Sequence, residues 1–359
     1  MAIMLLSLGF IGCEQFDFNK EQYKNVVYLL SDNDEFNIYD RAIADLNTEQ
    51  DTVFITVGVS GSVGTPEDIP VELTPYFIPN RVDAAIFETL DKDRLFYQYN
   101  KSRFDIDFKN WTNFLPENNY SFLPENMDGT GTPGTVKLKA TIPAGETKVS
   151  IPVIVKNLTS LSPDSLYLLD YKLTGAGSTE VNTNKQDILI PVYWKNNWTN
   201  SRKPLSYDMF GEQLQWRVNT KVPVANSERV ITGSPIMYPL SKNEIRLAAG
   251  IESTDATSTR TRRQQIDDNS IVIIVNSDNT LDFRPYKNIK VEKVLDTDIF
   301  YDVNHTNRYY TEEKTTTSGI PKYYKTFALH YRYRTPTESA FFWKYCKLTL
   351  RYEYQPNAK

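Results

Sequence analysis

Apolar residues alternate with polar residues along most of this chain, and this period of two constrains its fold more than any other feature. Residues 326–334 show it clearly, because one side of the expected strand holds Phe327, Leu329, Tyr331 and Tyr333. His330 falls on the other side, where we expect it to be half-exposed. Tyr and Phe, 23 and 18 in number, favour strands. Helical periodicity is almost absent, and only residues 83–90 predict a helix.

An Asn-rich segment that ends in proline, residues 195–204, separates two runs of such strands. We therefore expect an all-β fold: an N-terminal immunoglobulin-like β-sandwich over residues 26–195, then a second antiparallel β domain, a sandwich or a barrel, over residues 204–359. Within the first domain, residues 136–142 and 148–155 read as a hairpin, and Pro152 predicts an edge strand or a bulge. In the second, residues 271–276 and 280–285 read as another hairpin.

A short apolar run precedes Cys13, and a small residue, Gly12, stands directly before it. The run is too short to cross a bilayer as a helix, but it resembles a bacterial lipoprotein signal, residues 1–13, whose cysteine becomes the lipid-bearing first residue. The alternative is an apolar strand or a frayed terminus. With Cys13 acylated, Cys346 has no partner for a disulfide, and we expect it to be a small buried hydrophobe.

Composition and motifs exclude several function classes. The net charge is −5, without the excess of basic residues that nucleic-acid-binding proteins carry, so nucleic acid is not an expected partner. Two histidines are too few for a multi-histidine zinc site, and we expect neither a metal nor a cofactor. Asp105 and Asp107 only superficially match a chitinase-like acid motif, because Lys109 occupies the place of the general acid. We expect no enzyme activity, although 45 acidic residues leave spatial pairs of carboxylates open.

Three segments in order, residues 115–120, 140–155 and 161–169, resemble the domain of unknown function 1735 over residues 26–194. The C-terminal half is similar to the β domain that often accompanies it, through residues 243–250, 278–280 and 323–333. That family occurs on exported lipoproteins of the Bacteroidetes, in gene clusters for glycan capture and breakdown. The resemblance implies an outer-membrane lipoprotein that binds polysaccharide or oligosaccharide, beside a TonB-dependent transporter complex. It fixes no binding residues.

Candidate sugar-binding residues are aromatic, exposed and close to polar groups. Trp343 and Tyr345 fall on the polar side of residues 342–354 beside Lys347, so they are the first choice. Trp216 and the pair Tyr309 and Tyr310, expected in a polar loop, come next. The alternative for each is burial against a neighbouring loop. Trp194 and Trp198 are expected to hold the junction between the domains.

Two functions fit a lipidated β protein. The first is a non-catalytic glycan-binding protein on the outer membrane, facing the cell exterior, with the periplasmic face left open. The second is a structural or adhesin-type assembly lipoprotein whose edge strands pair with another chain. Soluble polysaccharide should bind to the first and not to the second.

The Cys13 thiol is the acylation site in this hypothesis. Replacing it, Cys13→Ala, should abolish incorporation of labelled palmitate and move the protein from the membrane fraction to the soluble fraction, because the lipid supplies the membrane affinity. Metabolic labelling followed by membrane sedimentation measures both. A variant that still carries label and still sediments would show that the lipoprotein hypothesis is wrong.

Overall fold

The computed structural model describes residues 25–32, 37–61, 64–76, 112–218, 222–298, 300–303 and 305–356. Strands make up 53% of the described residues, which also contain one α-helix, α4 (Arg262–Asn269). The expected all-β fold is confirmed. Cys13, the helix expected over residues 83–90, and Asp105 with Asp107 lie outside the described residues.

Two sheets face each other in the N-terminal domain. The first has the order β11 (Glu180–Val181), β1 (Val26–Leu29), β3 (Gln50–Val59), β9 (Lys148–Lys156) and β6 (Tyr120–Phe122). The second has the order β2 (Ala42–Asp45), β12 (Asp187–Lys195), β10 (Leu166–Gly175), β4 (Ile69–Pro75), β8 (Lys137–Ile142) and β7 (Met127–Asp128), with β5 (Thr112–Phe114) beside β10. Short 3-10 turns are η1 (Glu117–Asn119), η2 (Pro124–Asn126) and η3 (Leu158–Ser160). The apolar sides of both sheets form one buried cluster.

The hairpin expected from residues 136–155 is wrong. β8 pairs with β4 and β7, whereas β9 pairs with β3 and β6, so the turn after Ile142 carries the chain from one sheet to the other. Both strands turn their apolar side to the same core, and a period of two does not distinguish this connection from a hairpin. Pro152 lies opposite Phe54, and β6 covers only Val153–Val155 of β9, which leaves Pro152 at a local edge.

The C-terminal domain also contains two sheets. One has the order β13 (Leu205–Ser206), β17 (Ile236–Ser241), β18 (Glu244–Ala248), β19 (Ser270–Val275) and β20 (Leu281–Pro285). The other, which we call the long-strand sheet, has the order β15 (Val222–Pro223), β14 (Asp208–Arg217), β24 (Phe342–Tyr354), β23 (Pro321–Arg334) and β21 (Lys290–Lys293), with β16 (Arg229–Gly233) on β14 and β22 (Arg308–Thr315) on β23. The hairpin β19–β20 is confirmed.

A second buried cluster lies between these two sheets, separate from that of the first domain. It contains the expected core side of β23, and Cys346 is fully buried in it. His330 is not half-exposed, as the alternation suggests, but buried. The segment that follows β21 covers it, with His305 and Tyr301 close to its ring.

Buried polar contacts join the two domains. Trp194 donates from Nε1 to the carbonyl oxygen of Pro239 at 3.1 Å, and Asn196 donates to the carbonyl oxygens of Ser241 and Glu244. Arg246 of β18 forms an ion pair with Asp164 of the first domain, and both side chains are buried. Trp198 packs on the C-terminal core against Tyr309 and Phe327.

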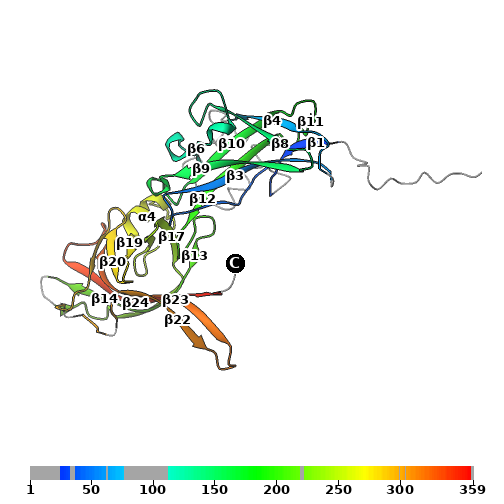
Figure 1. The fold of residues 1–359 in the computed structure, drawn as a ribbon. Helices are drawn as coiled ribbons and strands as arrows, with labels where there is room; N and C mark the ends of the chain where they lie inside the picture. The colour runs from blue at the N-terminus through cyan, green and yellow to red at the C-terminus, as the bar shows by residue number, and fades with distance from the viewer. Residues whose placement is uncertain are drawn as a thin grey trace, which may run out of the picture.

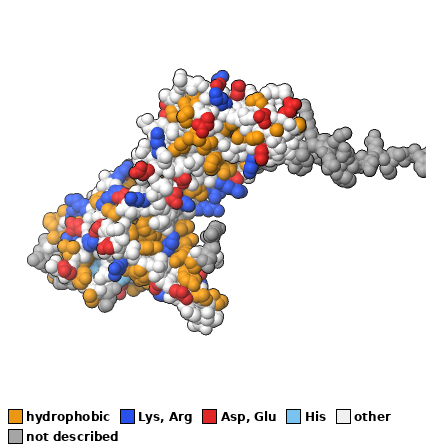
Figure 2. All heavy atoms as spheres, in the orientation of Figure 1, with side chains coloured by type: hydrophobic (Ala, Val, Ile, Leu, Met, Phe, Trp, Pro, Cys, Tyr) orange, Lys and Arg blue, Asp and Glu red, His pale blue; other side chains and the backbone are white. Residues whose placement is uncertain are grey.

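Figure 1 shows the two pairs of sheets end to end, with the hairpin of β22 and β23 projecting from the C-terminal domain. On the face drawn in Figure 2, basic and acidic side chains are interspersed over both domains, so neither sign of charge dominates this surface. A strongly charged polymer therefore has no obvious partner surface on this face.

Each domain should fold alone, because each has its own buried cluster. Trp198 packs with the second cluster, so the cut belongs before it, giving residues 20–195 and 196–359. Both fragments should show β-type circular dichroism and a cooperative melt, at lower temperatures than the intact chain because the junction is lost. Two unfolded fragments would contradict the division into domains.

Candidate functional site

The long-strand sheet has one side in the core and a second side, here called the outer face, that points away from it. Strand pairing places outer-face residues in rows across β14, β24 and β23. One row contains Glu212, Lys347 and His330, and the next contains Leu214, Tyr345 and Arg332. Because a sheet holds such side chains at fixed spacing, this face is a rigid frame for a binding site.

One end of the outer face brings together three of the predicted residues, Trp216, Trp343 and Tyr345. Phe300, from the segment after β21, packs on them, with its ring centroid 4.7 Å from that of Trp216 and 4.3 Å from that of Tyr345. Trp216 is therefore only 8% exposed and Tyr345 only 6% exposed. The expectation that these two rings are exposed is wrong, because a loop distant in sequence covers them.

Trp343 is partly buried and lies beside two cations. The guanidinium of Arg332 lies 5.0 Å from the centre of its ring and that of Arg334 lies 5.3 Å away. Arg332 also donates to the Tyr345 hydroxyl at 2.7 Å and forms ion pairs with Glu292 and Asp298. The Trp343 ring thus already has two guanidinium groups at cation–π distance, which leaves less of it for a sugar.

Tyr309 and Tyr310 lie in the strand β22 and not in a polar loop. Adjacent residues of a strand point to opposite sides, so the two rings separate. Tyr309 packs into the core, with its ring centroid 5.0 Å from that of Phe327. Tyr310 lies on the outer face and is 40% exposed. Tyr310 is the most exposed of the five predicted rings.

The uncovered end of the outer face holds a group that we call the aromatic platform: Phe210, Tyr310, Tyr324, Arg351 and Glu312. The guanidinium of Arg351 lies 5.1 Å from the centre of the Phe210 ring and 5.3 Å from that of Tyr324. Phe210, like Tyr310, is 40% exposed. Three strands, β14, β22 and β23, therefore present aromatic rings around one cation from a fourth, β24, on a surface that faces solvent.

An ion pair fixes the centre of the aromatic platform. Arg351 Nε lies 2.9 Å from Glu312 Oε1, and the Thr326 hydroxyl donates to the same oxygen at 3.0 Å. Burial alone would raise the pKa of Glu312, but the Thr326 hydrogen bond and the Arg351 charge lower it overall. The platform thus offers an ionised carboxylate and a guanidinium with a set orientation.

Gly211 holds the strand that carries Phe210 against its neighbour. Its φ is +153°, and a β-carbon there would lie 2.1 Å from the carbonyl oxygen of Lys347 in β24. Only glycine permits this approach. Sequence reasoning missed Phe210, Tyr324 and Arg351, although the alternation along β14, β23 and β24 puts each of them on the polar side.

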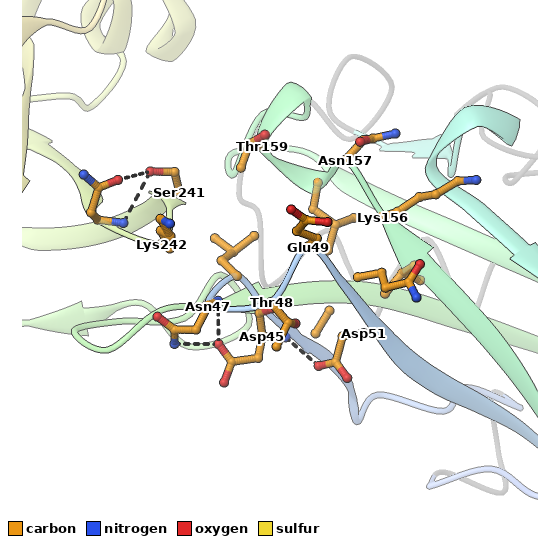
Figure 3. A pocket seen from close by; sticks show the side chains of 16 residues that line it. Asp45, Asn47, Thr48, Glu49, Asp51, Lys156, Asn157, Thr159, Ser241 and Lys242 are labelled. Carbon is orange, nitrogen blue, oxygen red and sulfur yellow. Dashed lines mark hydrogen bonds between the residues drawn. The ribbon is translucent and has the colours of Figure 1, made fainter.

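A groove of about 600 Å³ lies between the domains. Its walls are the β2–β3 turn and the end of β9 on one side and the β17–β18 turn on the other (Figure 3). The lining side chains are mostly polar, among them Asp45, Asn47, Thr48, Glu49, Asp51, Lys156, Asn157, Thr159, Ser241 and Lys242. No aromatic ring lines it among the described residues, so a sugar there would have no ring to stack on.

Two absences hold for the described part of the chain. No group of three or more His, Cys, Asp or Glu side chains is arranged to bind a metal ion. None of its helices combines the length and the apolar character that crossing a membrane requires.

Comparisons with known proteins agree on the fold. A family model described as "-like, C-terminal" matches residues 186–351, and no curated protein matches the chain. Solved structures with the same two-domain fold include a protein of unknown function from Bacteroides ovatus, 16% identical with a TM-score of 0.56 over 91% of this chain and 94% of its own. A multidomain protein including DUF1735 from the same species is 16% identical, with a TM-score of 0.53 and the same coverage. An auxiliary nutrient binding protein from Bacteroides thetaiotaomicron is 14% identical, with a TM-score of 0.52 over 90% of this chain and 92% of its own.

Because Trp216 is buried, we expect it to contribute to the stability of the C-terminal domain. Trp216→Ala removes the ring that packs on Phe300 and should lower the free energy of unfolding by about 3 kcal/mol, measured by urea denaturation. Phe341→Ala is the matched control, because that nearby ring is exposed and its loss should cost less than about 0.5 kcal/mol. Equal effects of the two substitutions would contradict the burial of Trp216.

Proposed function

We propose that this protein is a non-catalytic glycan-binding protein, held on the outer membrane by a lipid on Cys13. The observation that carries the proposal is the aromatic platform, where Phe210, Tyr310 and Tyr324 surround the Arg351–Glu312 pair on an uncovered sheet face. The fold it shares with an auxiliary nutrient binding protein supports it. So does the resemblance of the sequence to exported proteins of glycan-utilisation clusters.

The platform suits a sugar for physical reasons. A pyranose ring has an apolar C–H face that packs on an aromatic ring, and its hydroxyls need donors and acceptors at the edge of that contact. Arg351 supplies donors, and Glu312 supplies acceptors, at positions fixed by their mutual ion pair. Since these charges balance, the platform fits a neutral sugar better than an acidic one.

The Glu312 carboxylate argues against glycoside hydrolysis at the aromatic platform. Glycoside hydrolysis needs a carboxylic acid with a raised pKa to protonate the leaving oxygen. Glu312 has a lowered pKa because Arg351 and Thr326 stabilise its ionised form. It is suited to accept hydrogen bonds from hydroxyls and unsuited to donate a proton.

The proposed location follows from the signal-like residues before Cys13. A lipid there would hold both domains at the outer membrane, facing the cell exterior, next to a TonB-dependent transporter complex that takes up the glycan. The binding protein would then need only to keep polymer close to the transporter, and weak binding is sufficient for that.

Assembly through strand pairing is the weaker candidate. The edge strand it would use is β22, which pairs with β23 and projects from the domain (Figure 1). Glu312, Glu313 and Lys314 put consecutive charges on this strand. Charged edges of this kind oppose pairing with another chain.

Binding should depend on the platform rings. Against a panel of amylopectin, yeast mannan, laminarin, inulin, xyloglucan and pectic galactan, the native protein should bind at least one polymer in affinity electrophoresis. The dissociation constant should be roughly micromolar to millimolar. Tyr310→Ala and Phe210→Ala should each weaken binding about tenfold, because a few rings dominate such contacts. No reducing sugar should be released.

Phe54→Ala is the matched control, since this ring of the N-terminal domain is 46% exposed and lies far from the platform in the fold. It should leave binding unchanged. Unchanged binding in the two platform variants would move the site elsewhere, with the groove between the domains as the next candidate. A native protein that binds nothing on the panel would favour the assembly function.

A further inference from the structure

A small cavity opens on the outer face between the aromatic platform and the covered aromatic end. Its volume is about 180 Å³. Its lining includes Glu212, Glu228, Phe300, His330, Tyr345 and Lys347. A cavity of about 150 Å³ admits a ring the size of benzene, so this one has room for a single six-membered ring and not for a chain of them.

The floor of the cavity is the row of Glu212, Lys347 and His330. Lys347 is held at 3.0 Å from Asp302 and 3.6 Å from Glu212, so its ammonium group is fixed in position. These groups provide a cationic donor and anionic acceptors within one row of a rigid sheet. Such an arrangement matches the alternating donor and acceptor needs of sugar hydroxyls.

His330 carries an unused polar atom beside this space. The residue is 3% exposed, and its Nδ1 has no hydrogen-bond partner among the described residues. A buried polar atom without a partner costs free energy, and a ligand hydroxyl could reach this nitrogen once the side chains that cover it move aside. Burial and the neighbouring His305 lower the pKa of His330 to about 4, so the ring is neutral at pH 7 and its unprotonated nitrogen can accept a hydrogen bond from a hydroxyl.

The wall of the cavity is aromatic. Phe300 and Tyr345 lie against each other with ring centroids 4.3 Å apart, and both line the space. Tyr345 is thus covered from bulk solvent but borders the cavity. An apolar wall above a polar floor is the usual composition of a small-molecule pocket.

The cavity continues the aromatic platform. Phe210 and Glu212 are alternate residues of β14 and Thr349 and Lys347 are alternate residues of β24, so the cavity row follows the Phe210 row directly. Two residues along a strand span about 7 Å. A sugar in the cavity would therefore lie next to sugars stacked on the platform.

We propose that the cavity holds the terminal monosaccharide of a glycan whose following residues lie on the aromatic platform, so that this protein recognises chain ends and short oligosaccharides. The proposal rests on the proposed glycan-binding function and narrows its ligand class. An internal stretch of polymer could lie on the platform. Tyr345 and Phe300 form the wall of the cavity on the side away from the Phe210 row, so a chain that enters from the platform must end there.

The test uses the protein from Glu14 to Lys359, which lacks the lipid-bearing cysteine, and the polymer that the native protein binds in the affinity-electrophoresis panel. Mild acid hydrolysis converts this polymer to oligosaccharides of two to six units, and isothermal titration calorimetry measures both probes. If chain ends bind, the number of sites per gram of carbohydrate should rise as hydrolysis creates ends. The oligosaccharides should bind as tightly as the polymer.

Glu212→Ala and Lys347→Gln should weaken oligosaccharide binding at least tenfold. Glu146→Ala, an exposed carboxylate in a turn of the N-terminal domain, is the matched control and should have no effect. Since the chain has two histidines, the imidazole ¹⁵N spectrum resolves both rings once His305→Asn assigns them, and the His330 Nδ1 signal should shift on addition of oligosaccharide. Thermal melts of all variants confirm that they are folded.

The outcomes separate the two proposals. Chain-end recognition is wrong if the cavity variants bind as tightly as the native protein and the number of sites depends only on the mass of polymer. If Phe210→Ala still weakens binding in that case, the glycan-binding function stands. If the His330 signal does not move at saturating oligosaccharide, the cavity is not the site. If the native protein binds neither probe, both proposals fail.

Discussion

The buried ion pair of Arg246 and Asp164 fixes how the two domains meet. Arg246 is enclosed by the rings of Tyr238 and Tyr286, at 4.5 and 4.9 Å from their centres, and Asp164 reaches it from the other domain. Burial alone would lower the pKa of Arg246, but Asp164 raises it overall. Removing one partner of such a pair leaves a buried charge uncompensated, which costs several kcal/mol. The pair therefore opposes any other arrangement of the domains, and the groove between them depends on it.

The outer face owes its properties to the same alternation that builds the core. Along β23 and β24 every second side chain enters the buried cluster, so the remaining side chains must share one surface. The sequence places aromatic rings at several of those positions. A loop covers the rings at one end, where they stabilise the domain, and leaves those at the other end free to meet a ligand.

Alternation alone was enough to predict the strands, the β19–β20 hairpin and the buried side of β23. It could not show that β8 and β9 belong to different sheets, because pairing is a long-range property that a period of two does not encode. For the same reason it misjudged Trp216, Tyr345 and His330, which a distant loop covers. The alternation pattern did not predict the helix α4, because this helix has no apolar stripe. Its one sequence signal is the capping box formed by Thr261 and Gln264 at its start.

The division of the outer face also explains why affinity should come from few residues. Burying Trp216 and Tyr345 against Phe300 contributes to folding, and those contacts are already satisfied before any ligand arrives. Only rings that remain exposed can gain from covering a sugar, and each gain must exceed the entropy lost by a flexible glycan. The Arg351–Glu312 pair reduces that cost on the protein side, because both groups are ordered before binding. In the function proposed above, a preorganised platform beside a one-ring cavity would thus select the end of a chain without requiring tight binding.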